Sequence, residues 1–262
     1  MHKDSVSCLM VTANRPGFVA RAVALFEAQT YTNRELIIID DGEADLSNIV
    51  NSSPQRDAIR YYRLSSDCGL NLGQLRTKSI EVADGDWCIQ WDDDEWYHPE
   101  RIERQLNEAK LQGVGSSALK WTLMHINDLE ETKNKVFRVD TGIATPGTLL
   151  FRRDVGVEYR PLARNEDGIF MREVRDKMGL AVMGKEYSHL FIRVFHGANT
   201  WEVDHFMSRL HRRPLDWPTY AYARLLRKDI TQHRAFRLKK DESNAAMAYM
   251  NYSAHQVLEL SR

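Results

Sequence analysis

Residues 87–95 of this 262-residue chain read WCIQWDDDE, a mostly apolar run that passes directly into four carboxylates. A run of this kind is typical of a strand that is buried on both faces of a parallel sheet. The side chains of Asp92 to Glu95 repel one another and need a cation or solvent beside them. Their oxygens suit Mg²⁺ or Mn²⁺, which can also bind a diphosphate. The stretch therefore predicts a strand that ends at a metal site, with a solvated acidic turn as the alternative.

Three further apolar runs precede this one, at residues 6–11, 36–39 and 59–64. Helical patterns alternate with them, and Phe18 to Phe26 shows the first. This β-α-β-α-β-α-β order predicts an α/β fold with a mostly parallel central sheet flanked by helices. Such sheets bind ligands outside the carboxyl ends of their strands. Asp40 and Asp41 follow the second run, so we expect them to share one crevice with the acidic residues 92–95.

The second half of the chain changes character. The expected strands of a mixed or antiparallel extension cover residues 119–125, 136–139, 148–152 and 190–195, and residues 165–178 are expected to form a helix. From residue 201 onward the pattern is helical. No linker or repeat divides the chain, so we expect a single domain over residues 1–262, built from three parts: 1–115, 116–200 and 201–262.

The composition narrows the class of protein. Lys and Arg number 36 against 37 for Asp and Glu, a formal net charge of −1, so nucleic acid is not expected as a partner. The three cysteines, Cys8, Cys68 and Cys88, have no spacing typical of zinc or redox sites and fit a reducing compartment. We see no apolar signal core and no run long enough to span a bilayer, which favours a cytoplasmic location, including the inner face of the membrane.

Six segments, taken in order, resemble glycosyltransferase family 2. They are VSCLMVTANRP at 6–16, QTY at 29–31, ELIIIDDG at 35–42, NLG at 71–73 with Arg76, ADGD at 83–86, and QWDDDEWYHPERI at 90–102. The resemblance implies a GT-A type fold, with a Rossmann-like nucleotide-binding half, a mixed-sheet acceptor half and a helical C-terminal tail. It also implies an inverting glycosyltransferase of the hexosyltransferase class that uses Mn²⁺ or Mg²⁺. The donor would be a nucleotide-sugar, commonly a UDP-sugar, and the acceptor a glycan or a lipid-linked glycan.

The resemblance assigns nucleotide-sugar binding to Thr12, Asn14, Arg15, Asp40, Asp41, Arg76, Asp92 and Asp93. Within this set Asp41 would recognise the base, with Asp40 supporting its loop. Ala13 stands where the family usually has an aromatic residue, which leaves base stacking open. The residues alone also allow simpler interpretations: Thr12 and Asn14 could cap a helix, Asp40 to Gly42 could form a turn, and Arg76 could be a solvated helix residue.

The same resemblance supplies the metal ligands and the catalytic base. Asp94 and Asp92 form the family's DxD pattern, and His196, which follows an apolar strand, would be a third ligand. Asp167 would be the base that deprotonates the acceptor hydroxyl. The alternative for Asp167 is a carboxylate placed at a helix start by the helix dipole alone.

Other side chains have less definite roles. Glu166, Trp91, Asn199 and Trp201 are candidates for the substrate pocket. The tail is rich in basic and aromatic residues: Arg209, Arg212, Arg213, Trp217, Tyr220, Tyr222, Arg224, Arg227, Lys228, Lys239 and Lys240. We favour the interpretation that these residues form helices that cover the domain and expose a basic face to solvent. The alternatives are a platform for the acceptor, a homodimer surface or peripheral contact with anionic lipid. Two other functions stay open for the whole chain: a nucleotidyltransferase that makes nucleotide-sugars, and a non-catalytic protein that binds nucleotide or carbohydrate.

Overall fold

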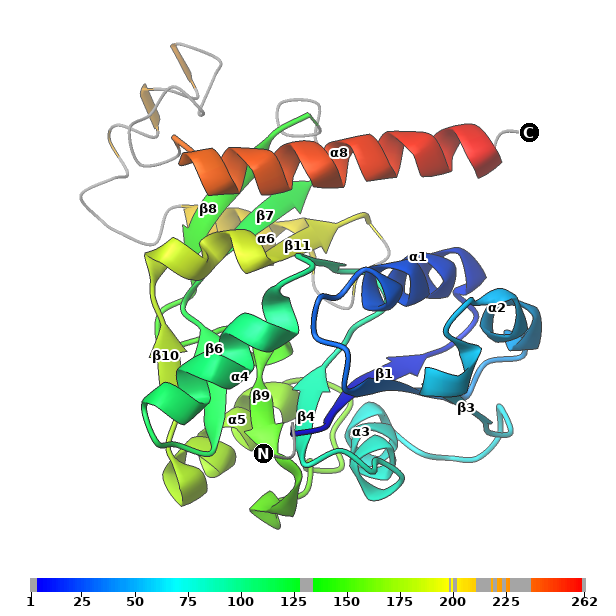
Figure 1. The fold of residues 1–262 in the computed structure, drawn as a ribbon. Coiled ribbons are helices and arrows are strands. Elements are labelled where there is room, and N and C mark those ends of the chain that lie inside the picture. Colours follow the sequence, from blue (N-terminus) through cyan, green and yellow to red (C-terminus); the bar gives the residue numbers. More distant parts are fainter. Residues whose placement is uncertain are drawn as a thin grey trace. The chain divides into compact units, whose positions relative to one another are not determined.

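The chain folds into two compact units in the computed structural model (Figure 1). The structure describes residues 4–127, 134–197, 199, 202–210, 218, 221–222, 225–226 and 237–260. The first unit comprises the described parts of Met1–Leu119 and Ala144–Met183, and the second those of Lys120–Ile143 and Gly184–Arg262. These units do not coincide with the three expected parts of the chain, because residues 144–183 return to the first unit.

The first unit is built on a seven-stranded sheet with the order β10-β6-β9-β4-β1-β2-β3. The strands are β1 (Val6–Thr12), β2 (Arg34–Asp40), β3 (Ile59–Arg63), β4 (Trp87–Gln90), β6 (Ser116–Leu119), β9 (Leu150–Arg152) and β10 (Ala181–Met183). β9 runs antiparallel to both of its neighbours, and the other pairs are parallel. The expected α/β fold with a mostly parallel sheet is therefore confirmed.

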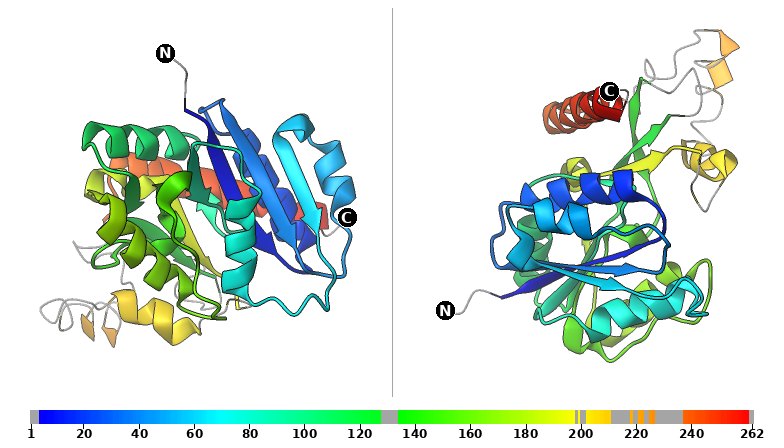
Figure 2. Two further views of the ribbon diagram at one scale, coloured as in Figure 1. Left: turned by 90° about the horizontal axis from the view of Figure 1, so that it is seen from below. Right: turned by 90° about the vertical axis from the view of Figure 1, so that its right-hand side faces the viewer.

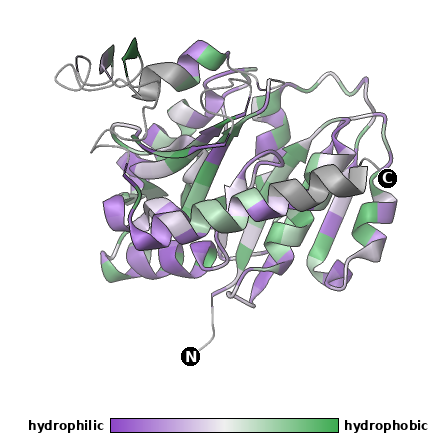
Figure 3. Cartoon of the chain, turned by 90° about the horizontal axis from the view of Figure 1, so that it is seen from above, coloured by the Kyte–Doolittle hydropathy of each residue, from purple (hydrophilic) through white to green (hydrophobic). Residues whose placement is uncertain are grey.

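Helices cover both faces of this sheet (Figures 1 and 2). On one face lie α1 (Pro16–Glu27), α2 (Ser47–Ser52) and α4 (Arg101–Leu111), and on the other lie α3 (Leu72–Glu81) and α5 (Glu166–Met178). The core under α3 and α5 includes Leu9, Ile37, Leu75 and Phe170, all nearly or fully buried. The hydropathy colours of Figure 3 show helices with both hydrophilic and hydrophobic residues, as expected for elements that place one face on a sheet.

The second unit contains three strands of a mixed sheet. In it β11 (Phe191–Phe195) runs parallel to β7 (Trp121–Ile126), and β8 (Val136–Asp140) runs antiparallel to β7. The unit also contains α6 (Val203–Leu210) and the long C-terminal helix α8 (Lys240–Leu260). A buried ion pair joins Arg138 of β8 to Glu242 of α8, and His125 of β7 lies 2.7 Å from the Tyr249 hydroxyl. Among the described residues, no helix is both long and apolar enough to cross a membrane.

One expected element is wrong in its extent. The apolar run over residues 119–125 forms two strands, because the chain leaves the first sheet at Leu119 and enters the second at Trp121. Two short strands were not expected at all, β10 and the two-residue β5 (Trp96–Tyr97). Most of the tail's basic and aromatic residues lie outside the described residues or have side chains outside them.

Candidate active site

The carboxyl ends of β1 and β4 bring the first loop of the chain against the acidic cluster. The two strands pair in parallel with Leu9 opposite Gln90, and the same register carried three residues onward places Thr12 beside Asp93. The Thr12 hydroxyl donates a hydrogen bond of 2.6 Å to Asp93 Oδ2. Asp93, the second residue of the acidic cluster, is therefore fixed to the last residue of the first strand.

Arg15 is the cation of this loop. Its Nη1 atom lies 3.1 Å from Asp93 Oδ1 and 3.1 Å from Asp94 Oδ2. Burial lowers the pKa of Arg15, but the two carboxylates outweigh burial and raise that pKa above its ordinary value. Burial and the neighbouring Asp94 raise the pKa of Asp93 to about 6. The pKa of Asp93 is thus raised mainly by burial, although Thr12 and Arg15 oppose the rise.

A second cation, Arg76 of α3, lies between the acidic cluster and the start of α5. Its Nη2 atom donates to Asp92 Oδ1 at 3.1 Å, and its Nε atom lies 3.2 Å from Glu166 Oε1. Burial and Asp94 raise the pKa of Asp92, and Arg76 opposes this rise. Asp167 follows Glu166 in the first turn of α5 and adds its charge to the group around Arg76. The structure therefore brings the expected metal ligand Asp92 and Glu166, the neighbour of the expected base Asp167, to separate nitrogen atoms of one guanidinium.

The loops after β1 and β2 are tied together beside this group. Asp40 is fully buried and accepts hydrogen bonds from Gly42 N at 2.9 Å and from the Tyr61 hydroxyl at 2.8 Å. Asn14, whose φ is 56°, accepts from the backbone N–H groups of residues 43 and 44 through its side-chain oxygen. Asp40 and Asn14 therefore have structural bonds, whereas Asp41 keeps part of its surface exposed. Burial raises the pKa of Asp41.

The acidic residues fit a divalent cation in chemistry but do not form a complete protein site. No group of three or more His, Cys, Asp or Glu side chains suited to a metal occurs within the described part of the chain. Asp92 and Asp94 offer oxygen donors, the type that Mg²⁺ and Mn²⁺ prefer. Gly147 lies against Asp92, since a Cβ atom there would be 3.2 Å from Asp92 Oδ2. Further ligands would have to come from a bound diphosphate, from water or from His196.

Several residues that were expected to line the substrate pocket are buried or bonded elsewhere in the structure. Trp91 has no exposed surface, and its indole N–H donates to Ala22 O at 3.1 Å, so the expectation that it lines a pocket is wrong. Glu166 is 3% exposed and faces Arg76, which leaves almost no surface for a substrate. Asn199 closes the turn after β11, where its side chain bonds to His196 N and Val194 O. His196 belongs to the second unit, so its role as a metal ligand stays a prediction, and Trp201 lies outside the described residues.

Sequence reasoning gave no role to a buried cation below the acidic cluster. Arg101 of α4 is fully buried, 4.5 Å from the Tyr97 ring centroid, and Nε donates to Gln105. The Tyr97 hydroxyl donates to Asp92 O at 2.9 Å and so links this layer to the cluster. The signal was present in the sequence, because Arg101 and Gln105 interrupt the apolar face that Ile102 and Leu106 give to α4.

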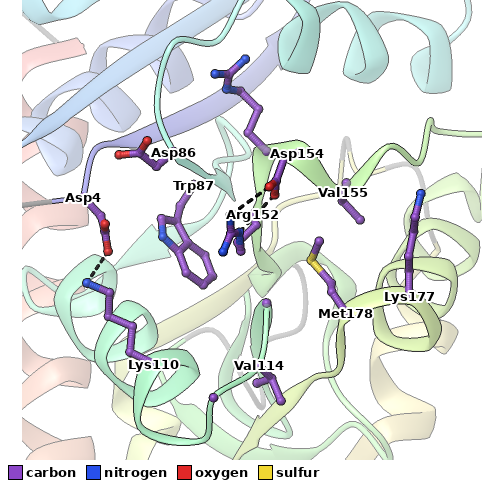
Figure 4. A pocket seen from close by; sticks show the side chains of 13 residues that line it. Asp4, Asp86, Trp87, Lys110, Val114, Arg152, Asp154, Val155, Lys177 and Met178 are labelled. Atoms are coloured by element: carbon purple, nitrogen blue, oxygen red, sulfur yellow. Dashed lines mark hydrogen bonds and ion pairs between the residues drawn. The ribbon is translucent and has the colours of Figure 1, made fainter.

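A hollow of about 990 Å³ lies at the opposite edge of the first sheet (Figure 4). Its lining includes residues just before β1 and at the start of β4, together with the C-terminal ends of α4 and α5. Its charged side chains have partners: Lys110 pairs with Asp4, Arg152 with Asp154, and Lys177 donates to Gly156 O. The hollow lies at the amino ends of the parallel strands, so it is separate from the acidic site.

Fold and site together define an α/β protein with two acidic loops at the carboxyl edge of its sheet and a carboxylate pair on an adjacent helix. The profile described as Glycosyl transferase family 2 matches residues 7–155, more than half of the chain. The chain belongs to glycosyltransferase family 2, and the resemblance carried by residues 6–102 is confirmed.

Two curated relatives match less than half of the chain. The amylovoran biosynthesis glycosyltransferase AmsB of Erwinia amylovora is 29% identical over 119 residues, which cover 44% of this chain and 39% of AmsB. EpsH of Bacillus subtilis is 29% identical over 109 residues, which cover 42% of this chain and 31% of EpsH. The match thus spans about a third of the length of these relatives.

Solved structures share the fold. The S. aureus protein TarS 1–349 in complex with UDP-GlcNAc has a TM-score of 0.61 and 12% identity, covering 93% of this chain and 79% of that one. The mannosyltransferase PcManGT from Pyrobaculum calidifontis, in complex with GDP-Man and Mn²⁺, has a TM-score of 0.57 and 12% identity, covering 100% of this chain and 79% of that one. These likenesses confirm the expected GT-A fold class.

Proposed function

We propose that this chain transfers a sugar from a nucleotide-sugar to an acceptor hydroxyl, with inversion at the anomeric carbon and with Mn²⁺ or Mg²⁺ as cofactor. One observation carries the proposal: Arg76 contacts both Asp92 of the acidic cluster and Glu166, the neighbour of Asp167. The group that would hold the donor diphosphate and the group that would activate the acceptor thus converge at one edge of the sheet.

The proposed donor is a UDP-sugar. Asp41 would accept a hydrogen bond from the base, because it keeps exposed surface while Asp40 is taken up by Gly42 and Tyr61. UDP-GlcNAc bound to TarS supports this donor class, and GDP-Man bound to PcManGT makes a GDP-sugar the alternative. Thr12 would hold Asp93 in place below the diphosphate, and Arg15 would pair with Asp93 and Asp94 until the metal binds.

Asp94 and Asp92 would hold the divalent cation, with His196 as a further candidate ligand, and the cation would neutralise the leaving diphosphate. Asp167 would remove the proton of the acceptor hydroxyl. At the same time the acceptor oxygen would bond to the anomeric carbon, and the bond between that carbon and the diphosphate would break. Asp167 suits this role better than Glu166 because it keeps exposed surface, whereas Glu166 is buried against Arg76. The glycan or lipid-linked acceptor, contact of the tail with a membrane, and a homodimer are further proposals that rest on the family resemblance and on composition.

The test is calorimetric titration of UDP and GDP, with and without Mn²⁺, on the wild type and on Asp94→Asn, Asp41→Asn and Asp57→Asn. We expect Mn²⁺-dependent binding of UDP, loss of the metal dependence in Asp94→Asn, and at least about a tenfold loss of affinity in Asp41→Asn. Asp57 is fully exposed, so its variant should bind as the wild type does. Absence of nucleotide binding under every condition would overturn the donor-site assignment.

Turnover separates the remaining alternatives. With UDP-sugars and acceptor panels, release of UDP that Asp167→Asn abolishes would support transfer. Tight UDP binding without turnover would favour a non-catalytic binding protein. Release of pyrophosphate from a nucleoside triphosphate and a sugar phosphate would favour a nucleotidyltransferase.

A further inference from the structure

Arg76 has contacts that differ from those of a simple nucleotide-binding residue. Its side chain is 13% exposed and lies between two carboxylates, with Asp92 Oδ1 3.1 Å from Nη2 and Glu166 Oε1 3.2 Å from Nε. One partner belongs to the acidic cluster after β4 and the other to the first turn of α5. The Nη2 atom donates a hydrogen bond to Asp92, whereas Nε is within ion-pair distance of Glu166 without a hydrogen bond to it. The planar guanidinium holds these two nitrogen atoms in a fixed geometry, which a lysine ammonium does not reproduce.

An aromatic layer fixes the position of this guanidinium. Arg76 lies 5.8 Å from the ring centroid of Tyr159. That ring stacks on Phe170 of α5, with centroids 3.8 Å apart and planes 10° apart. The Tyr159 hydroxyl donates to Gln90 Oε1 at 2.8 Å, just before the acidic cluster. Tyr159 therefore contacts α5 through its ring and the last residue of β4 through its hydroxyl.

The helix that carries Arg76 is held against the segment leading to α5. Gly73 N donates to Leu162 O at 3.1 Å, and a Cβ atom at Gly73 would lie 1.9 Å from Arg160 O. Thr77 Oγ1 accepts a hydrogen bond of 3.1 Å from Tyr159 N. α3 cannot move away from this segment without breaking these contacts. The backbone that carries Arg76 is therefore held in place relative to the segment that leads to α5.

We propose that Arg76 is a positioning residue that holds the carboxylate pair Glu166–Asp167 at a fixed position relative to Asp92. It acts on the reaction through these carboxylates. The inference rests on the proposed function, because it takes Asp167 as the base and Asp92 as a ligand on the donor side. It differs from the expectation that Arg76 contacts the nucleotide. A nucleotide contact would appear in UDP affinity, whereas a positioning role appears in kcat.

The first experiment compares Arg76→Lys and Arg76→Met with the wild type by UDP–Mn²⁺ titration and by steady-state transfer. We expect UDP affinity within about threefold of the wild type and a fall in kcat of about a hundredfold or more, since misplacing a reacting group by about 1 Å costs that much. Added methylguanidinium should restore part of the kcat of Arg76→Ala and leave that of Arg76→Lys unchanged. A large loss of UDP affinity with kcat preserved would overturn the proposal in favour of a nucleotide contact.

A double-mutant cycle measures the bridge without any turnover. Arg76→Met and Glu166→Gln should each lower the Tm, and the double variant should lose less than the sum, because the first change alone leaves a buried carboxylate unpaired. The exposed pair Arg104–Glu100 of α4, at 2.9 Å, is the matched control and should give additive shifts. Additive shifts for Arg76 and Glu166 would overturn the bridge. A wild type that binds UDP and never transfers sugar would overturn the proposed function, while this cycle would still report on the bridge.

Discussion

The guanidinium of Arg15 lies 3.1 Å from a carboxylate oxygen of Asp94, the residue proposed as the principal metal ligand. Arg15 follows β1 and Asp94 follows β4, so the parallel pairing of the two strands brings them together. A cation of the chain therefore lies where a divalent metal would bind. Metal binding at Asp94 would require that Arg15 gives up this contact, and we expect the released guanidinium to pair with the diphosphate of the donor.

The exchange predicts that Arg15→Met binds Mn²⁺ more tightly than the wild type when no nucleotide is present. We expect about a tenfold gain, because one charge pair at partial exposure contributes on that scale. With UDP present the gain should shrink or reverse, since the variant also lacks a cation for the diphosphate. Calorimetry or Mn²⁺ electron paramagnetic resonance measures both quantities, and Arg104→Met is the control. Weaker Mn²⁺ binding by Arg15→Met without nucleotide would contradict the exchange.

A pair of glycines tests how tightly the first two loops must fit. At Gly42 a Cβ atom would lie 2.4 Å from Asn14 N, whereas at Gly17 nothing lies within 4 Å. We expect Gly42→Ala to lower the free energy of unfolding by about 1–3 kcal/mol and to weaken UDP binding, because the loops after β1 and β2 must separate. Gly17→Ala, in α1, should raise stability by about 0.5–1 kcal/mol and leave UDP binding unchanged. Urea unfolding and UDP titration check both, and equal effects of the two changes would refute the argument.

Much of the fold could be predicted from the sequence because β1, β2 and β4 are buried on both faces and appear as apolar runs. The break at Lys120 could not be predicted, since a run of apolar residues does not show that its two ends pair with different sheets. Strand β10 has three residues, and its middle residue, Val182, is 41% exposed. A segment so short carries no periodic signal.

The position of the acidic residues was predictable where a carboxylate lies at the end of an apolar run, as Asp40 at the end of β2 and Asp92 two residues after β4 do. The contact of Arg76 with Glu166 was not, because it depends on the packing of α3 and α5, which lie far apart in the sequence. Trp91 shows a second limit. An aromatic residue beside an acidic cluster can line a pocket or fill the core, and only its packing against Phe26 and Tyr97 shows that it fills the core.

Asp93 should make stability depend on pH in the metal-free protein. Burial, first, and the neighbouring Asp94 raise its pKa from the ordinary 3.8 to about 6, so the folded chain binds this proton more tightly than the unfolded chain does. For such a group the free energy of unfolding falls as the pH rises from about 4 to about 6, and above that range the full penalty remains. A rise of this size corresponds to at most about 3 kcal/mol.

Asp93→Asn removes the titration while its side-chain oxygen can still accept from Thr12. The variant loses the ion pair with Arg15 at every pH at which Asp93 is charged, so the absolute change combines two effects. The free energy of unfolding of the variant minus that of the wild type should nevertheless increase by about 1–3 kcal/mol as the pH rises from 4.5 to 7.5. Urea unfolding in the presence of a chelator measures this difference, and Asp57→Asn, at an exposed position, should show none. If the difference between Asp93→Asn and the wild type is constant over this range, the Asp93 carboxylate is already charged at pH 4.5 and Arg15 outweighs its burial.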